Sequence, residues 1–299
     1  MDLEAIQRIR SFNRTVTEGI GALDDRFLGR SRPLGESRVL WEIGPEGAEV
    51  RVLRRRLGLD SGYFSRVLTS LEQQGMIAVR VSPDDRKVRH ATLTETGLAE
   101  RAELDRRSDN LAIRMLEPLS APQREALVAA MSEVERLLQS SMVRFGVEAP
   151  TSADARWCVD QYFAELEARF ETGFDPSRSI SADARELVPP AGLFVVARLR
   201  ERPLGCGALK FHGNGPAELK RMWVAPATRG LGIGRRLLLA LEQHARDAGA
   251  SAVRLETNRA LTQAIALYRR SGYLEVDAFN DEPYAHHWFE KRLSGKRSG

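Results

Sequence analysis

The chain has 299 residues, enough for two ordinary domains that each bury their own core. Hydrophobic residues make up 42% of it and charged residues 29%, a composition typical of soluble globular proteins. No apolar run approaches the roughly 20 residues that a membrane-spanning helix needs, and the acidic start of the chain lacks the pattern of a secretory signal. Cys158 and Cys206 form neither a disulfide framework nor a metal-ligand spacing, so we expect a cytoplasmic protein with no membrane partner.

The net charge of +4 is distributed unevenly along the chain. Acidic and basic residues balance in residues 1–149, so the excess lies in residues 150–299. If the first half binds DNA, it must therefore do so through local basic patches rather than through overall charge.

The first half is predicted to be mainly helical. Apolar residues recur at helical spacing from Leu3 to Val16, and Pro118 and Pro122 separate two long helical patterns near its end. The predicted helices are residues 4–17, 38–43, 49–57, 60–74, 99–115 and 122–142. Two predicted strands, residues 77–81 and 88–94, flank a turn rich in Pro and Asp.

The helix at residues 60–74 has a good N-cap in Asp60 and a good stop signal in Gly75. Its apolar residues share one face: Phe64, Val67, Leu68 and Leu71. The other face carries small or hydrogen-bonding side chains and one Arg, which suits close approach to base edges in a major groove. The candidate DNA contacts are Ser61, Tyr63, Ser65, Arg66 and Thr69 on this helix and Arg86 and Lys87 in the following turn.

This order of helix, capped helix and basic hairpin resembles the winged helix-turn-helix of the MarR family of regulators. Two segments carry the resemblance, LDSGYFSRVLTSLEQQG at residues 59–75 and SPDDRKVRHATLTETG at residues 82–97. The resemblance implies a DNA-binding and dimerisation domain at residues 1–145. Its partners would be a double-stranded DNA operator and a second copy of the chain, joined through the terminal helices. The helix at 60–74 would enter the major groove, and Arg86 would reach a minor groove from the wing tip.

The composition changes at residues 145–152, where Gly146, Pro150, Thr151 and Ser152 lie between periodic segments, and we predict a domain boundary there. Residues 150–299 then alternate between helices and strands, which predicts a mixed α/β domain. The predicted helices are residues 154–170, 233–248 and 261–270, and the predicted strands are 193–200, 204–212, 218–224, 252–257, 273–276 and 286–291.

A glycine-rich segment, Arg229-Gly230-Leu231-Gly232-Ile233-Gly234, connects the strand at 218–224 to the helix at 233–248. Glycines at a helix start let backbone N–H groups close on a bulky anion, and the helix N-terminus favours negative charge. A Walker P-loop is excluded because Arg235 and Arg236, not Lys and Ser or Thr, follow Gly234. A Rossmann loop is excluded because that loop follows the first strand of its domain.

The context of this segment, V-x-P-x-x-R-G-x-G-x-G, resembles the pyrophosphate-binding motif of the GNAT acetyltransferases. The segment AIALYRRSGY at residues 264–273 resembles their second motif, and the resemblance covers about residues 150–293. It implies acetyl-CoA as the acyl donor. The implied cofactor contacts are Val224, Arg229, Gly230, Leu231, Gly232, Ile233, Gly234 and Arg235. The family often has an Asn seven residues before its Tyr; because Leu261 is there instead, Asn258 is added as a further candidate.

Tyr268 has the position where the family commonly uses a phenol to protonate the departing thiolate. The alternative for Tyr268 is an aromatic side chain that packs on the sheet. A neutral amine also needs a base, and Glu218 matches where some members place a carboxylate. Glu256 on the next strand is the rival base, and a strand-end charge is the alternative for both.

The acceptor site is expected near the first helix and the last strands of the second domain. Tyr162, Glu165 and Arg169 share one helix face, while residues 280–284 precede the last strand. Packing is the alternative role for Tyr162 and for His287. Because His286 and His287 alternate faces of a strand, they do not ligate one metal from adjacent positions, and we expect no metal site.

Together these patterns predict two domains, a mainly α winged helix-turn-helix followed by an α/β mixed-sheet GNAT fold. The predicted function is a transcriptional regulator fused to an N-acetyltransferase that moves acetyl from acetyl-CoA to a small amine by direct transfer. Three alternatives stay open. In the first, the second half is a non-catalytic sensor of acetyl-CoA or an amine. In the second, the acceptor is a protein lysine. In the third, the helix-turn-helix serves only dimerisation.

Overall fold

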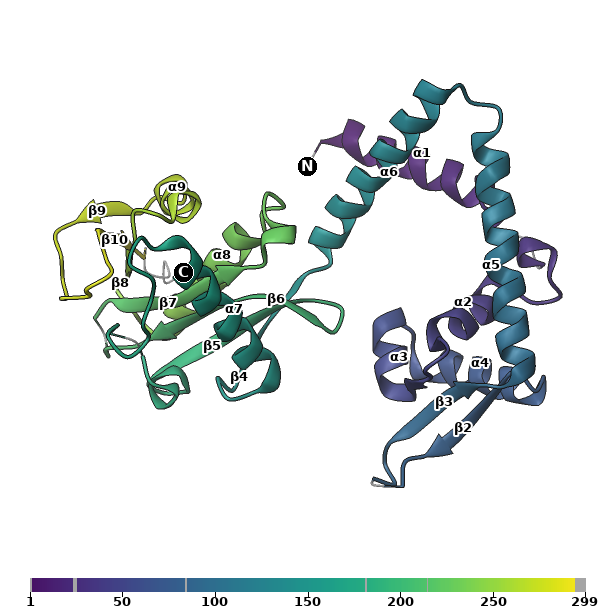
Figure 1. The fold of residues 1–299 in the computed structure, drawn as a ribbon, viewed down its shortest axis with the longest axis horizontal. Helices are drawn as coiled ribbons and strands as arrows, with labels where there is room; N and C mark the ends of the chain where they lie inside the picture. The colour runs from purple at the N-terminus through teal and green to yellow at the C-terminus, as the bar shows by residue number, and fades with distance from the viewer. Residues whose placement is uncertain (1, 24–25, 84, 181, 214, 294–299) are drawn as a thin grey trace. The chain divides into compact units, whose positions relative to one another are not determined.

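The computed structural model describes residues 2–23, 26–83, 85–180, 182–213 and 215–293. The chain divides into two compact units, Met1–Met131 and Ser132–Gly299 (Figure 1). Each unit has its own hydrophobic core. No helix in the described ranges is both long enough and apolar enough to cross a lipid bilayer.

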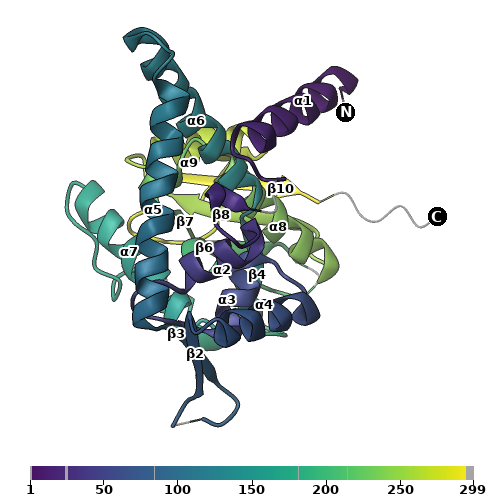
Figure 2. The ribbon, with the colours of Figure 1, turned by 90° about the vertical axis from the view of Figure 1, so that its right-hand side faces the viewer.

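The first unit is mainly helical. Its helices are α1 (Leu3–Gly19), η1 (Phe27–Gly29), α2 (Leu34–Ile43), α3 (Val50–Leu57), α4 (Ser61–Gln73) and α5 (Glu95–Leu116), and α6 (Ala121–Ser141) begins in it. A small antiparallel sheet has the order β1–β3–β2, formed by β1 (Ala48–Glu49), β2 (Ile77–Val81) and β3 (Arg89–Leu93). The β2–β3 hairpin extends past α3 and α4, as a wing does (Figures 1 and 2).

Helix α4 begins where the sequence predicts it. The Asp60 side chain accepts a hydrogen bond from the backbone N of Tyr63 at 2.8 Å, which satisfies a donor that the helix itself leaves unpaired. The predicted apolar face is buried in the core of the unit, where it meets Leu40 of α2 and Leu53 of α3. Burial of this face leaves the polar face of α4 toward solvent.

The second unit is built on a seven-stranded sheet of order β4–β5–β6–β7–β8–β10–β9. Every neighbouring pair of strands is antiparallel except β7 and β8, which are parallel. The strands are β4 (Arg144–Glu148), β5 (Gly192–Leu199), β6 (Arg202–Lys210), β7 (Ala217–Val224), β8 (Ala252–Thr257), β9 (Leu274–Val276) and β10 (His287–Arg292). This mixed sheet confirms the predicted α/β class of the second half.

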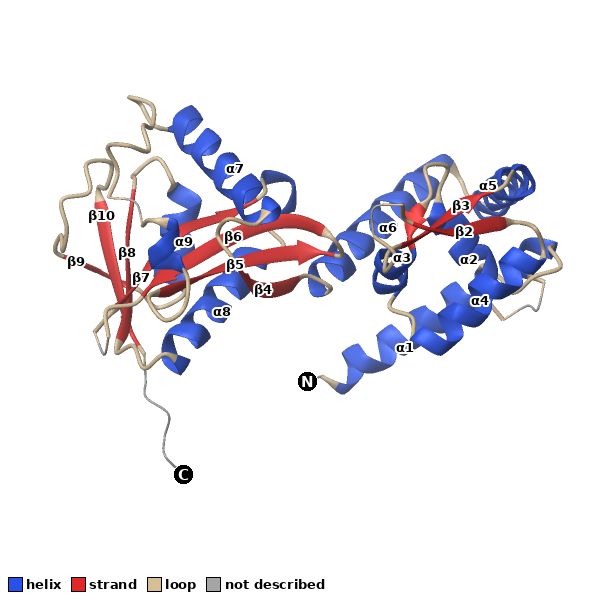
Figure 3. Ribbon diagram, turned by 90° about the horizontal axis from the view of Figure 1, so that it is seen from below, coloured by secondary structure: helices blue, strands red, loops and turns tan. Residues whose placement is uncertain are grey.

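Helices cover both faces of this sheet, and β5 shows why. Leu193 and Val195 point into one apolar cluster, whereas Phe194 and Val196 point into another, as the two-residue period of a strand requires. The first cluster packs under α8 (Ile233–Asp247) and α9 (Thr262–Arg270), and the second packs under α7 (Ala153–Arg169). Figure 3 shows α7 and α8 on opposite sides of the sheet.

The predicted boundary at residues 145–152 differs from the observed division. Residues Arg144–Glu148 form β4 and pair with β5, with Phe145 opposite Ala197 and Val147 opposite Val195. The short strand has a Gly in its middle and ends before Pro150, so its composition resembles a linker. Only the pairing with β5 makes it part of the sheet. Arg236 of α8 also donates to the carbonyl of Val143 at 2.9 Å, which fixes the segment before β4.

Candidate active site

The parallel strands β7 and β8 separate almost as soon as they pair. Only two residue pairs join them, Ala217 with Val253 and Glu218 with Arg254. Beyond these pairs the strands no longer bond to each other, so the facing edge of β7 is open from Leu219 onward. Backbone groups on an open edge are available to a ligand.

A β-bulge distorts β7 at the same place. Cys206 of β6 lies opposite Trp223, but Ala208, two residues on, lies opposite Lys220, so β7 carries one extra residue here. Arg221 absorbs the irregularity with a left-handed φ of 53°, uncommon for a residue other than glycine. Consecutive side chains of a regular strand point to opposite faces, yet Lys220 and Arg221 both line one cavity. The bulge therefore allows both charged side chains, Lys220 and Arg221, to line the same cavity.

The larger of two neighbouring cavities, called here the cofactor cavity, has a volume of about 950 Å³. It lies between α7, the end of β7, the glycine-rich loop with the start of α8, and α9. Its lining includes Met222, Trp223, Val224, Thr228, Arg229, Gly230, Gly232, Ile233, Gly234, Arg235, Leu267 and Tyr268. Most of the predicted cofactor contacts therefore line one cavity.

The glycine-rich loop has the backbone form that an anion cradle needs. Gly230 and Gly232 have φ values of 79° and 73°, and Gly232 is the N-cap of α8. Apart from the adjoining chain, no atom of the described residues lies within 4 Å of a Cβ built on either glycine, so the left-handed backbone, not crowding, is what requires them. The 15-residue helix α8 directs its N-terminus at the cavity, which favours a negatively charged ligand.

The charge of Arg229 was predicted to face the ligand, but its guanidinium contacts other protein groups. Its guanidinium forms an ion pair with Glu165 of α7, and its Nε donates to the carbonyl of Val224 at 3.0 Å. Glu165 also accepts from Trp223 Nε1 at 2.8 Å and lies 2.9 Å from Arg169 Nε. Burial opposes ionisation of Glu165, but the bonds from Arg229 and Trp223 outweigh it and lower the pKa of this carboxyl. The bonds of Glu165 therefore connect α7 to the end of β7.

Leu231 and Asn258 also differ from the predicted cofactor contacts. Leu231 does not line the cofactor cavity; its side chain packs in an apolar cluster with Val143 and Ile233. The Asn258 amide donates to the carbonyl of Tyr284 at 2.7 Å and accepts from the N–H of Ala260 at 2.9 Å, so it shapes a loop. Neither arrangement can be inferred from motif spacing.

Tyr268 lies in α9, with its hydroxyl 3.8 Å from Met222 Sδ and its ring 6.1 Å from that of Phe289. The side chain is buried, yet it lines the cofactor cavity. Burial raises the pKa of Tyr268 above its ordinary value, and the nearby charge of Glu256 raises it further. The phenol therefore stays protonated over the physiological range. Tyr162 of α7 has a pKa raised mainly by burial in the same way.

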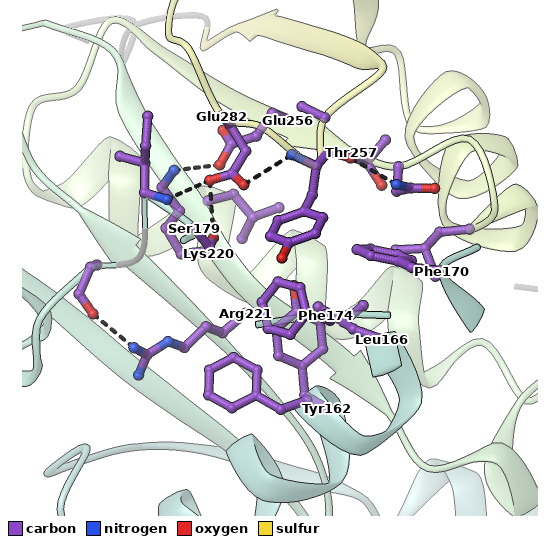
Figure 4. A pocket seen from close by; sticks show the side chains of 18 residues that line it. Tyr162, Leu166, Phe170, Phe174, Ser179, Lys220, Arg221, Glu256, Thr257 and Glu282 are labelled. Atoms are coloured by element: carbon purple, nitrogen blue, oxygen red, sulfur yellow. Dashed lines mark hydrogen bonds and ion pairs between the residues drawn. The ribbon is translucent and has the colours of Figure 1, made fainter. Parts of the chain in front are cut away.

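The second cavity, called here the aromatic cavity, has a volume of about 90 Å³. It shares Tyr162, Leu166 and Leu261 with the cofactor cavity, so the two cavities meet at these residues. Its aromatic lining consists of Tyr162, Phe163, Phe170, Phe174 and Tyr284. Figure 4 shows rings of this group along one side of the cavity and Lys220, Glu256 and Glu282 along another.

Charged groups enter the aromatic cavity from β7 and β8. Lys220 Nζ lies 2.5 Å from Glu256 Oε1 and 3.4 Å from Glu218 Oε2. Glu218 lines neither cavity; it pairs with Arg254 at 2.7 Å and with His212 at 3.1 Å. Burial raises the pKa of Glu218, but its bond from Arg254 and the charge of Lys220 outweigh this and lower it overall. Of the two predicted bases, Glu256 alone lines the cavity.

Two loops that line the aromatic cavity are hydrogen-bonded to each other. The Glu282 carboxylate accepts from Ser179 Oγ at 3.0 Å and from the N–H of Ile180 at 2.6 Å. The Tyr284 hydroxyl accepts from the N–H of Asp175 at 3.0 Å. The segment after α7 is therefore bonded to the segment before β10, and sequence reasoning did not identify its contribution to the site. Lys220 and Arg221 were also missed, although two adjacent charges inside an apolar strand are a signal of irregular geometry.

The first unit exposes the predicted DNA contacts. Ser61, Tyr63, Ser65, Arg66 and Thr69 are all exposed on the polar face of α4, and Arg86 and Lys87 are exposed on the wing. Arg56 of α3 forms an ion pair with the buried Glu42, whose Oε2 lies 3.4 Å from the Arg56 guanidinium. In the described part of the chain, no group of three or more His, Cys, Asp or Glu side chains is placed to hold a metal ion.

Comparison with known proteins finds both families that the motifs indicate. A model of the Acetyltransferase (GNAT) family matches residues 159–273, and a model of the MarR family matches residues 28–87. An IAA acetyltransferase of Azospirillum brasilense is 44% identical over 127 residues, covering 42% of this chain and 82% of that protein. The N-alpha-acetyltransferase RimI of Mycobacterium tuberculosis is 38% identical over 133 residues, covering 44% of this chain and 78% of that protein.

Solved structures are also similar to the chain. The match with an acetyltransferase of GNAT family from Staphylococcus aureus covers 51% of this chain and 99% of that protein. The sequence identity is 16% and the TM-score is 0.44.

Substitution of Gly232 by Ala should weaken binding of acetyl-CoA. An L-residue in the left-handed conformation costs about 1–2 kcal/mol, so the loop will relax away from its cradle form and the Kd should rise about 10-fold. Gly249→Ala is a matched control, since Gly249 has a φ of 82° and open space beyond it but lies outside both cavities. Isothermal titration calorimetry measures both variants; equal Kd values for the two would contradict a role for the loop.

Proposed function

Because the chain belongs to the GNAT acetyltransferase family and also carries a MarR family domain, we propose a bifunctional role. The second unit transfers acetyl from acetyl-CoA directly to a small primary amine, and the first binds double-stranded DNA as a homodimer. A cytoplasmic location belongs to the proposal, because acetyl-CoA and chromosomal DNA are both found there.

One observation supports the transfer more than any other. The cofactor cavity contains Tyr268, the aromatic cavity contains Glu256, and the two cavities meet at Tyr162, Leu166 and Leu261. A donor thioester in one cavity and an amine in the other can therefore approach each other at the junction. This proximity is what direct transfer requires, because it turns a bimolecular step into one within a complex.

Acetyl-CoA is held in this proposal by the loop at the start of α8. The backbone N–H groups of Gly230, Gly232, Ile233 and Gly234 bind the pyrophosphate, and the exposed guanidinium of Arg235 adds charge. Arg229 acts indirectly, since its guanidinium pairs with Glu165. The open edge of β7 at Met222 to Val224 offers backbone groups to the pantetheine arm.

The reaction follows from these positions. The amine nitrogen attacks the thioester carbonyl, a C–N bond forms, and the tetrahedral intermediate collapses with cleavage of the C–S bond. One proton leaves the nitrogen for the Glu256 carboxylate, and the departing thiolate takes one proton from the Tyr268 hydroxyl. A proton then returns from Glu256 to Tyr268, which restores both groups. Glu256 replaces Glu218 as the preferred base because Glu218 lines neither cavity.

The DNA-binding half of the proposal is supported by the exposed faces of the first unit. The polar face of α4 and the wing present the groups expected for base and phosphate contacts. Helices α1 and α6 bury none of their residues within the chain, although Leu3, Ile9 and Val128 are apolar and more than half exposed. A second copy of the chain would cover such apolar side chains.

Tyr268→Phe should reduce kcat by about 100-fold or more, because general-acid catalysis typically contributes a factor of 10² to 10⁴. Thiol release from acetyl-CoA with a panel of amines measures the rate. Tyr273→Phe is the matched control: Tyr273 is a buried tyrosine 5.8 Å from Tyr268, ring to ring, but it lines neither cavity. An unchanged rate for Tyr268→Phe would remove its acid role, and no turnover by the wild type with any amine would favour a sensor.

Glu256→Gln should reduce kcat/KM at neutral pH by about 100-fold, because the amide cannot accept the proton. Glu218→Gln should reduce it far less, since Glu218 reaches the cavity only through Lys220. Rates measured for both variants from pH 6 to 10 decide between the two carboxylates. The opposite order of effects would assign the base to Glu218.

Removal of positive charge from the wing should weaken DNA binding in a salt-dependent way. A side chain that neutralises one phosphate contributes about 1 to the slope of log K against log salt, so Arg86→Ala and Lys87→Ala should each reduce the slope by that amount. Fluorescence anisotropy with a 30-base-pair duplex over a salt series measures the slope. Arg106→Ala, an exposed Arg paired with Glu103 on α5, provides the control. Identical slopes for all three variants would contradict DNA binding by the wing.

A further inference from the structure

We propose that the acceptor is a free small amine that also carries an aromatic group and a carboxylate, with Arg221 as the carboxylate-binding residue. An aromatic amino acid is the simplest compound of this class. The inference rests on the proposed function, because it names the substrate of the same site.

Packed aromatic rings form one wall of the aromatic cavity. Ring centroids of Phe163 and Phe174 lie 5.4 Å apart, and those of Phe174 and Tyr284 lie 5.0 Å apart. Phe170 joins both, 5.8 Å from Phe174 and 5.8 Å from Tyr284. Such a continuous group of rings favours a planar apolar group over a hydrated polyamine, because aromatic pairs prefer stacked or edge-to-face contact at these distances.

Arg221 brings a positive charge to the lining of the same cavity. The β-bulge turns this side chain into the aromatic cavity, where its guanidinium lies 5.8 Å from the ring centroid of Phe163 and donates to the carbonyl of Ala182 at 2.8 Å. Burial lowers the pKa of Arg221 more than Tyr162, Cys206 and Asp183 raise it. A ligand carboxylate would offset this cost of burial, and a guanidinium is suited to bind one through two parallel hydrogen bonds.

Acidic and basic groups lie at different places in the lining of the cavity. The Glu256 carboxylate, which the mechanism assigns to the amine, and the Arg221 guanidinium lie apart in Figure 4. Lys220 forms an ion pair with Glu256 at 2.5 Å, on the side of the cavity where the amine is placed. A ligand with both an amine and a carboxylate therefore meets a complementary group for each.

Two loops that are hydrogen-bonded to each other line the aromatic cavity. Glu282 is bonded to Ser179 and Ile180, and Tyr284 is bonded to Asp175, which holds the two loops together beside the cavity. A lysine on a folded protein would need room for the main chain on both sides of it. A lining formed by two mutually bonded loops favours a free small molecule.

The experiment compares amines that differ in one feature at a time. Purified full-length protein with acetyl-CoA is assayed for thiol release with phenylalanine and tryptophan, with 2-phenylethylamine, which lacks the carboxylate, and with alanine, which lacks the ring. Spermidine and a lysine-containing peptide represent the competing classes. We expect kcat/KM for phenylalanine or tryptophan to exceed that for each of the others by about 10- to 100-fold, the effect typical of a charge-assisted bond or a buried ring.

Variants of Arg221 test its assigned role. Arg221→Gln should abolish the preference for phenylalanine over 2-phenylethylamine while activity on 2-phenylethylamine persists, and Arg221→Lys should retain part of the preference. Arg259→Gln is the matched control, because Arg259 pairs with Glu171 on the surface and lines neither cavity. Thermal unfolding of each variant verifies that it is folded.

Other results would overturn the inference. Equal or faster turnover of 2-phenylethylamine, spermidine or the peptide by the wild type would do so, as would a preference that survives in folded Arg221→Gln. A separate readout keeps the two proposals distinct: calorimetry of phenylalanine with protein saturated with CoA. If phenylalanine binds and Arg221→Gln abolishes this binding, the ligand class holds even where no acetyl transfer occurs. If phenylalanine neither binds nor reacts, the ligand class is wrong, whatever other amine is acetylated.

Discussion

The early separation of β7 from β8 is the constraint on which the rest of the second unit depends. A sheet normally pairs its strands along their length, and an open edge inside a sheet leaves backbone donors and acceptors unsatisfied. Here two residue pairs hold the strands together, and the remainder of each strand turns toward a cavity. The strands stay in place because apolar clusters under α7 on one face and under α8 and α9 on the other fix them.

The charges around this opening are better explained by function than by stability. Glu256, Lys220, Glu218 and Arg254 form a chain of ion pairs, and the Lys220 side chain is only 8% exposed. Desolvation of buried ion pairs offsets most of their attraction, so apolar residues of similar size would stabilise the strands at least as well. A chain of alternating charges does, however, hold the Glu256 carboxylate in one position beside the junction of the cavities.

Arg229 shows how a motif and its role can differ. Its place at the start of the glycine-rich segment marks the family, and the expectation from the motif is a phosphate contact. In the fold, Arg229 connects Glu165 of α7 with the carbonyl of Val224. It therefore stabilises the arrangement of helix and strand around the cofactor cavity, and the backbone of the glycines is left to bind the anion.

The sequence alone determined the order of the two folds, nearly every helix and strand, and the glycine-rich loop with Tyr268. These features depend on local patterns: the Asp60 cap, the apolar stripe of α4, and glycines at positions that need a left-handed backbone. Only the tertiary structure decided that residues 144–148 complete the sheet, that Glu256 and not Glu218 lines a cavity, and that Lys220 and Arg221 face the same space. Strand pairing, a β-bulge and hydrogen bonds between two loops all join residues that are far apart in the sequence. No local pattern in the chain specifies which residues they bring together.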